Sequence, residues 1–202
     1  KIFGFQVLEF CSKMIDMPQY SIASEQKRLL EIVQQVQQFI NRIDTLSEWQ
    51  LLQQPSFGGW SLAQVMEHLN VYCRHYLPLI DQAILEERGN SGNYHSGWLG
   101  EYFTKLMQPL PDGTLSKKMQ APAKAQPVQA LNAVAVKTEF RLHQEKLMLL
   151  LQNSHFANWQ KQRIPTSLSK WISLRLGDTL RFFVAHEYRH LLQMQRILQQ
   201  MS

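Results

Sequence analysis

Four long segments of this chain repeat apolar residues at steps of three and four, and this repetition constrains the fold more than any other feature. In the first segment, residues 24–44, the apolar positions follow a 4-3-4-3 spacing: Leu29, Val33, Val36, Ile40 and Ile43. Such spacing places the side chains on one face of an α-helix. Alternation typical of a strand occurs only in residues 171–176. The pattern predicts an all-α protein with four long helices.

The second segment opens with the clearest helix start in the chain. Ser61 and Gln64 have the spacing of a capping box, while Trp60 and Val65 have that of a hydrophobic staple. Pro78 lies further along the same segment and is expected to kink the helix, because its ring clashes with the carbonyl four residues earlier.

The third segment spans residues 128–152. Its expected core face carries these residues: Leu131, Val134, Thr138, Leu142, Glu145 and Leu149. His143 falls on another face with Phe140, and we interpret it as structural or exposed. The fourth segment begins at Gly177-Asp178, with Asp178 as the expected N-cap.

A long connection, residues 89–127, separates the second segment from the third and is rich in Gly, Asn, Ser and Pro. Only residues 98–107 within it have a helical pattern. A connection of this length is usually functional or packed as a lid.

The simplest fold for these segments is an antiparallel four-helix bundle with a long connection between helices 2 and 3. At 202 residues the chain is long enough for one well-packed domain and short for two. We assign residues 24–202 to the bundle. Residues 1–23 are interpreted as an N-terminal extension, either a short helix or a segment foreign to the natural chain.

Composition excludes several functional classes. No apolar run approaches the roughly 20 residues that cross a bilayer, so no membrane partner is expected. The net charge of +5 is scattered, and its densest cluster (Lys117, Lys118 and Lys124) lies in no nucleic-acid-binding motif. Two cysteines, Cys11 and Cys73, are too few for a disulfide scaffold, which favours a reducing cytoplasmic location.

Two histidines in the fourth segment suggest a metal site. His186 and His190 stand one helical turn apart, so they can bind one metal ion together. The alternative is a structural pair bonded to a carboxylate such as Glu67 or Glu187, because an unpaired buried polar group costs about 1–3 kcal/mol.

Residues 186–190 also match the zinc-protease motif H-E-x-x-H. No His, Asp or Glu follows His190 to complete such a site, and no sheet is predicted beside it. A third ligand must therefore come from upstream, and His68 is the natural candidate, with His75 a weaker one. An isolated histidine on an apolar face is more often a hydrogen-bonded core residue. Three imidazoles with an open position are the ligand set of catalytic zinc sites.

Residues 59–69 and 176–197 resemble the second-helix and fourth-helix signatures of the DinB-like/YfiT-like superfamily, and the likeness extends over about residues 25–200. The resemblance implies a four-helix bundle in which His68, His186 and His190 bind a divalent metal, commonly zinc or nickel. Members of that superfamily include transferases and isomerases that use a low-molecular-weight thiol (bacillithiol, mycothiol or glutathione) and YfiT-like metal-dependent hydrolases. Homodimers are common among them.

Two functions remain open from the sequence. The first is an enzyme that activates a thiol or water at the metal and acts on a small-molecule substrate. Its nearest acidic groups are Glu67 and Glu187, although Glu187 points about 100° away from the metal face and is interpreted as a surface carboxylate. The second is a non-catalytic metal-binding or apo dimeric bundle with a stress-related or binding role. A fourth ligand, such as His75, would favour the second.

Overall fold

The computed structural model describes residues 17–86, 89, 92–110, 114, 120–128 and 130–201. The predictions for residues 1–16, Lys117 and Lys118 lie outside this range. The described part is mostly helical, as predicted, and contains six α-helices: α2 (Ile22–Arg42), α3 (Glu48–Leu52), α4 (Leu62–Glu86), α5 (Trp98–Met107), α6 (Ala133–Asn153) and α7 (Leu176–Gln199). Two short 3-10 turns accompany them: η1 (Ala123–Ala125) and η2 (Ser154–Phe156).

Within the described residues, four short strands form two antiparallel pairs. They are β1 (Gln19–Ser21), β2 (Asn93–His95), β3 (Arg163–Pro165) and β4 (Ser173–Arg175). β1 pairs with β2 and β3 pairs with β4. Only β4 was expected from alternation, because three-residue strands are too short to carry a pattern of their own.

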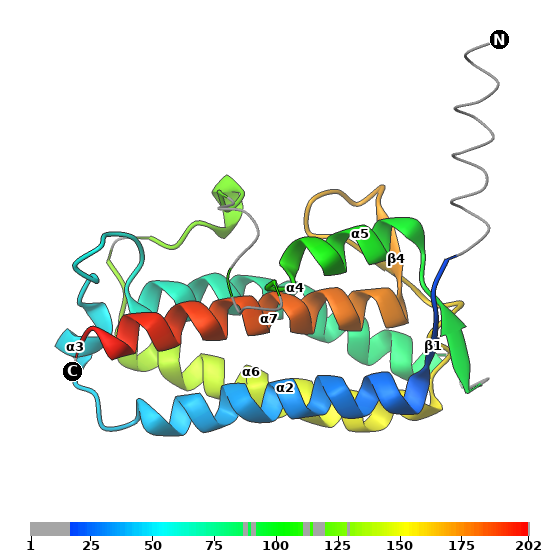
Figure 1. Ribbon diagram of the computed structural model, residues 1–202, viewed down its shortest axis with the longest axis horizontal. Coiled ribbons are helices and arrows are strands. Elements are labelled where there is room, and N and C mark those ends of the chain that lie inside the picture. Colours follow the sequence, from blue (N-terminus) through cyan, green and yellow to red (C-terminus); the bar gives the residue numbers. More distant parts are fainter. Residues whose placement is uncertain are drawn as a thin grey trace, which may run out of the picture.

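The four long helices α2, α4, α6 and α7 lie side by side (Figure 1). Contacts between α4 and α6 keep the same order along both helices. Asn70 donates to the Val136 carbonyl at 3.1 Å, and Lys146 pairs with Asp81 at 2.6 Å further on. These two helices are therefore parallel, which differs from the expected antiparallel packing of all neighbours.

The α2–α6 and α4–α7 pairs are antiparallel. At one end of α2, Gln26 donates to the Leu151 carbonyl at 2.5 Å, and Arg141 pairs with Asp44 beyond its other end at 2.6 Å. Because α4 and α6 run in one direction, the chain must return along the molecule between them (Figure 1). This return accounts for the long connection that the sequence predicts, and α5 forms over the predicted helical patch within it.

The capping box predicted for the second helix is present. Gln64 accepts from the Ser61 backbone N–H at 3.0 Å, and the Gln64 backbone N–H donates to the Ser61 hydroxyl at 3.2 Å. Pro78 lies inside α4. None of the described helices combines the length and apolar character needed to span a bilayer.

The predicted core face of the third helix is wrong. Val134, Leu142 and Leu149 are more than half exposed, whereas the opposite face, with Phe140 and Leu147, is fully buried. Helix α6 has apolar residues on two faces, and its neighbours α2 and α4 cover the second one. His143 lies between the two faces and is half-buried.

The last helix begins earlier than expected, and Asp178 is not its N-cap. Helix α7 starts at Leu176 with Arg175 as the cap residue. Asp178 instead accepts hydrogen bonds from the Ser96 hydroxyl at 2.6 Å and the Gly97 backbone N–H at 2.9 Å. It therefore ties α7 to the segment before α5.

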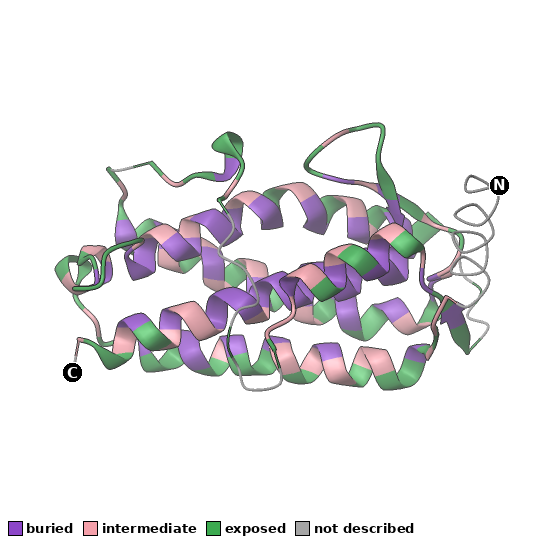
Figure 2. Cartoon of the chain, turned by 45° about the horizontal axis from the view of Figure 1, so that its top comes forward, coloured by how far each residue is buried: buried purple, intermediate pink, exposed green. Residues whose placement is uncertain are grey.

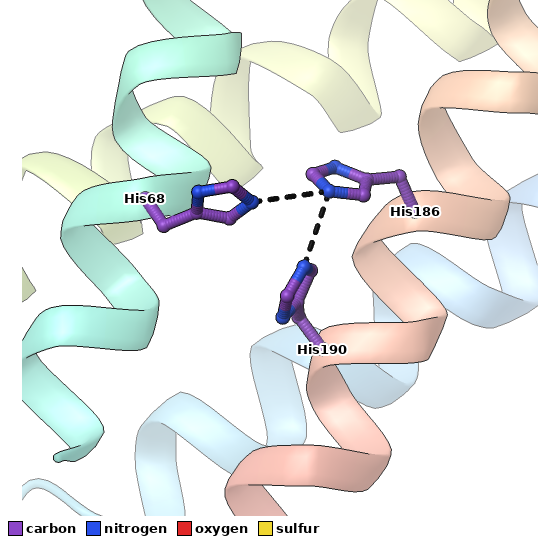
Figure 3. A group of neighbouring side chains, drawn as sticks. All are labelled: His68, His186 and His190. Atoms are coloured by element: carbon purple, nitrogen blue, oxygen red, sulfur yellow. Dashed lines mark hydrogen bonds between the residues drawn. The ribbon is translucent and has the colours of Figure 1, made fainter. Parts of the chain in front are cut away.

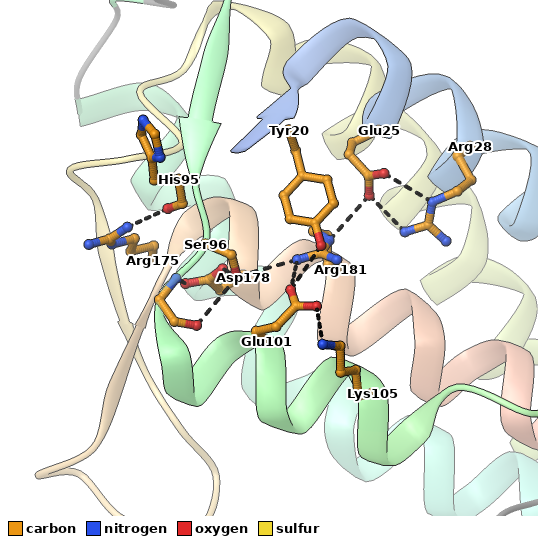
Figure 4. Close-up of polar contacts among 11 residues, drawn as sticks. Tyr20, Glu25, Arg28, His95, Ser96, Glu101, Lys105, Arg175, Asp178 and Arg181 are labelled. Atoms are coloured by element: carbon orange, nitrogen blue, oxygen red, sulfur yellow. Dashed lines mark hydrogen bonds and ion pairs between the residues drawn. The ribbon is translucent and has the colours of Figure 1, made fainter. Parts of the chain in front are cut away.

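A buried ionic cluster forms at the same end of α7 (Figure 4). Arg181 is only 4% exposed and lies 2.8 Å from Glu101 of α5 and 3.2 Å from Glu25 of α2. Its guanidinium group also stacks over the ring of Tyr20, 3.7 Å from the centroid. Burial alone would raise the pKa of Glu101, but the hydrogen bond and charge of Arg181 hold it below its ordinary value. The cluster joins three elements that are distant in sequence.

Candidate metal centre

Three histidines from the antiparallel helices α4 and α7 converge between these helices (Figure 3). The Nε2 atom of His186 lies 3.2 Å from Nε2 of His68 and 3.1 Å from Nε2 of His190. All three side chains are at least nine-tenths buried. The structure thus brings together the three residues that the sequence selects, 118 positions apart for His68 and His186.

The spacing of these nitrogens fits one metal ion. Zinc lies about 2.0–2.1 Å from histidine nitrogen in tetrahedral sites, so two such ligands stand about 3.3 Å apart. The two short Nε2 separations, 3.1 and 3.2 Å, are close to this value. Among the described residues, this is the one group of three or more His, Cys, Asp or Glu that could hold a metal ion.

Hydrogen bonds to the other ring nitrogens fix two of the imidazoles. Nδ1 of His68 lies 2.6 Å from the carbonyl oxygen of Ala125, which only accepts, so Nδ1 carries the proton. Nδ1 of His190 lies 2.8 Å from the side-chain oxygen of Gln193 and carries a proton for the same reason. Both Nε2 atoms then point lone pairs at His186. Partners of this kind orient metal-binding histidines.

The convergence leaves an electrostatic conflict that a cation would relieve. Nε2 of His186 can carry at most one proton, yet it faces two lone pairs. Its Nδ1 atom is buried without a hydrogen-bond partner among the described residues. A metal ion between the three Nε2 atoms would accept all three lone pairs and let Nδ1 of His186 hold the proton.

Burial keeps these imidazoles neutral, which is the form that binds metals. It lowers the pKa of His190 to about 3 and that of His186 well below its ordinary value, and neighbouring histidines add to both shifts. Burial also lowers the pKa of His68, partly offset by the bond to the Ala125 carbonyl. The site is therefore ready to bind metal at neutral pH without first losing protons.

Aromatic rings surround the histidines. The Tyr72 ring centroid lies 4.5 Å from that of His186 and 5.0 Å from that of His68. Trp60 lies 5.0 Å from His68 by the same measure, and Phe182 stacks on His186 at 6.3 Å. Burial raises the pKa of Tyr72, so its phenol stays protonated at neutral pH. These rings give the site an apolar wall.

The two acidic residues considered from the sequence, Glu67 and Glu187, direct their carboxylates to partners other than the three histidines. Glu67 pairs with Arg74 at 2.9 Å, and the same guanidinium group also pairs with Glu139 of α6. Glu187 is fully buried, so its interpretation as a surface carboxylate is wrong. It accepts from the thiol of Cys73 at 3.6 Å and from the Gln144 amide at 3.1 Å. Burial raises the pKa of Glu187 to about 8. Neither carboxylate has a hydrogen bond to the three histidines.

The two other candidate histidines lie apart from the site. Nε2 of His75 bonds to the Pro165 carbonyl at 3.1 Å, so the weaker candidate for a ligand is engaged with β3. Nδ1 of His143 bonds to the side-chain oxygen of Asn70 at 2.9 Å, consistent with the structural role assigned to it.

The sequence did not indicate the two groups that orient the candidate ligands. Ala125 acts through its backbone carbonyl, which has no residue signature. Gln193 lies three positions after His190, the spacing at which side chains on a helix meet, so this partner could have been found.

The fold and the site together define a helical protein with a candidate three-histidine metal centre. The sequence profile of the DinB superfamily matches residues 31–194, which include all three histidines. The chain belongs to the DinB superfamily. No curated protein and no solved structure matches it.

Proposed function

We propose that this protein is a metal-dependent enzyme of the DinB superfamily in which His68, His186 and His190 hold a divalent ion, zinc or nickel. The observation that carries the proposal is the convergence of three Nε2 atoms from α4 and α7. An ion bound there supplies Lewis acidity, which lets a thiol or water act as a nucleophile near neutral pH.

Three protein ligands leave a position for a reacting group. His75, the residue that could have closed the site, bonds instead to the Pro165 carbonyl. This observation favours the enzyme over the non-catalytic binding protein, because structural zinc sites usually have four protein ligands. The aromatic wall formed by Trp60, Tyr72 and Phe182 would exclude water and contact an apolar part of a small-molecule substrate.

The proposed reaction is transfer of a low-molecular-weight thiol to an electrophile, or hydrolysis. In either reaction the three imidazoles would hold the ion. The hydrogen bonds from His68 to Ala125 and from His190 to Gln193 would keep the imidazole rings in place. We further propose that the four long helices form one four-helix bundle, that the protein acts as a homodimer, and that it works in the cytoplasm. The buried free thiol of Cys73 suits that reducing compartment.

The first test is the metal content of protein purified without a polyhistidine tag. His68→Ala should lose most of the bound metal, because it removes the single ligand supplied by α4. His143→Ala is the matched control, since it removes a histidine bonded only to polar groups outside the site. Near-stoichiometric metal in the wild type and the control, but not in His68→Ala, is expected. Equal metal in all three proteins would refute the site.

The second test separates the two functions. Nickel-loaded or cobalt-loaded protein is titrated with bacillithiol, mycothiol or glutathione, and its absorption spectrum is followed. A thiol that enters the open position changes the spectrum. A spectrum unaffected by any thiol, together with no hydrolysis of ester or amide substrates, would favour the non-catalytic binding protein.

A further inference from the structure

The connection between β3 and β4 presents apolar side chains to solvent at its tip. Trp171 is 96% exposed, more than any other large hydrophobic residue in the described part of the chain. Leu168 is 58% exposed and Ile172 37% exposed beside it. Figure 2 shows this connection projecting away from the helices, with exposed residues along its tip. Clustered apolar exposure of this kind usually marks an interaction site.

Hydrogen bonds fix the shape of this tip. The Thr166 backbone N–H donates to the Ile172 carbonyl at 2.8 Å, and the Ile172 N–H donates to the Ser169 carbonyl at 3.1 Å. The Ser167 N–H donates to the hydroxyl of Tyr76 on α4 at 3.1 Å. The apolar residues are thus held outward by an ordered loop anchored to the helices, which reduces the entropy lost on docking.

The charged side chains of the segment that carries this tip are all positive. Residues 154–177 contain no Asp or Glu, and they carry Lys161, Arg163, Lys170 and Arg175. Lys161, Arg163 and Lys170 are exposed. The whole chain has a net charge of +5, so a second copy would not complement this segment by its net charge. An anionic surface would complement the positive charge of this segment.

We propose that the β3–β4 connection docks the protein on an anionic lipid bilayer surface. Tryptophan favours the boundary between headgroups and acyl chains, and the aliphatic Leu168 and Ile172 can enter the hydrocarbon edge beside Trp171. Exposed lysine and arginine attract anionic headgroups. The tip projects rather than forming a groove, and its aliphatic residues offer nothing for base stacking, which disfavours a nucleic acid. A chain whose described helices are too polar or too short to span a bilayer can still bind a bilayer surface through such a tip.

The test is flotation of the full-length protein with phosphatidylcholine vesicles, with and without phosphatidylglycerol. Binding is expected only to the anionic vesicles. Trp171→Ala should weaken it about tenfold or more, from the cost of losing one buried aromatic side chain. Lys170→Gln should weaken it about fivefold. The control is Trp49→Ala, a 69% exposed tryptophan on α3 at the opposite end of the molecule (Figure 1), which should bind like the wild type.

Folding of each variant is checked by its melting temperature, which these exposed positions should leave unchanged. The proposal is overturned if the wild type does not float with anionic vesicles, or if Trp49→Ala weakens binding as much as Trp171→Ala. It is also overturned if Trp171→Ala binds like the wild type. Tight binding of a single-stranded oligonucleotide through Trp171, or a dimer that Trp171→Ala dissociates, would assign the tip to another partner.

Discussion

Replacing Arg181 with methionine keeps most of the side-chain length but removes the cation from the buried cluster. The guanidinium group lies 2.8 Å from Glu101 and 3.2 Å from Glu25. Removing one partner of a buried ion pair costs about 3–5 kcal/mol. Glu101 would keep the hydroxyl of Tyr20 at 3.0 Å and the ammonium group of Lys105 at 3.3 Å. We therefore expect the lower end, a loss of about 3 kcal/mol in the free energy of unfolding.

Urea denaturation at neutral pH measures this loss. The matched control is Arg141→Met, which removes a cation from an ion pair with Asp44 at 2.6 Å in which both side chains are partly solvent-exposed. Surface pairs of this kind contribute about 0–1 kcal/mol, so the control should be nearly as stable as the wild type. Equal losses in the two variants would show that burial does not strengthen the Arg181 cluster.

The same cluster predicts a pH dependence. The pKa of Glu101 in the folded protein lies below its ordinary value of 4.5, so the unfolded chain binds its proton first as the pH falls. The stabilisation from Glu101 is therefore complete above pH 4.5 and is lost as the pH falls through the folded pKa. Glu101→Gln removes this titration and should flatten the stability profile below that pH. Parallel profiles for the two proteins would contradict the argument.

Three further predictions concern packing and the metal site. Gly177→Ala would place a methyl group 2.7 Å from the ring of Tyr94 and should destabilise the fold by about 1–3 kcal/mol, measured by thermal melting. Gln193→Ala should weaken zinc binding about 10-fold to 100-fold in a competition titration with a chromogenic chelator, whereas Gln199→Ala should not. Added zinc should raise the melting temperature of the metal-stripped wild type but not that of His68→Ala, because a ligand stabilises the state that binds it.

The sequence predicts the long helices well because each carries a periodic apolar stripe. It fails where a helix has apolar residues on more than one face. In α6 both the Val134–Leu142 face and the Phe140–Leu147 face are compatible with a core. The choice between them depends on where α2 and α4 lie, which the pattern within α6 does not contain.

The same limit explains the error at Glu187. A carboxylate within a helix is usually exposed, but α7 contacts α2, α4 and α5 and is buried on nearly every side. Asp178 was misassigned for a different reason. The backbone N–H groups of Leu176 and Gly177 bond to the carbonyls of Gln162 and Trp159, so α7 begins where these distant contacts place it.

The three candidate metal ligands were accessible from sequence because their spacing and the superfamily signatures both select them. Their hydrogen-bond partners were less accessible. The Ala125 carbonyl reaches His68 only because the connection between α4 and α6 returns along the molecule. No pattern of side chains in the sequence indicates the path of this connection.

The separation between His68 and His186, 118 residues, has a consequence for biosynthesis. One ligand of the proposed site leaves the ribosome long before the other two, so a nascent chain that lacks α7 presents only one of the three imidazoles of the site. Metal acquisition must then wait until α7 has been translated and has docked against α4. An ion bound at the proposed site therefore cannot guide the folding steps that precede the docking of α7.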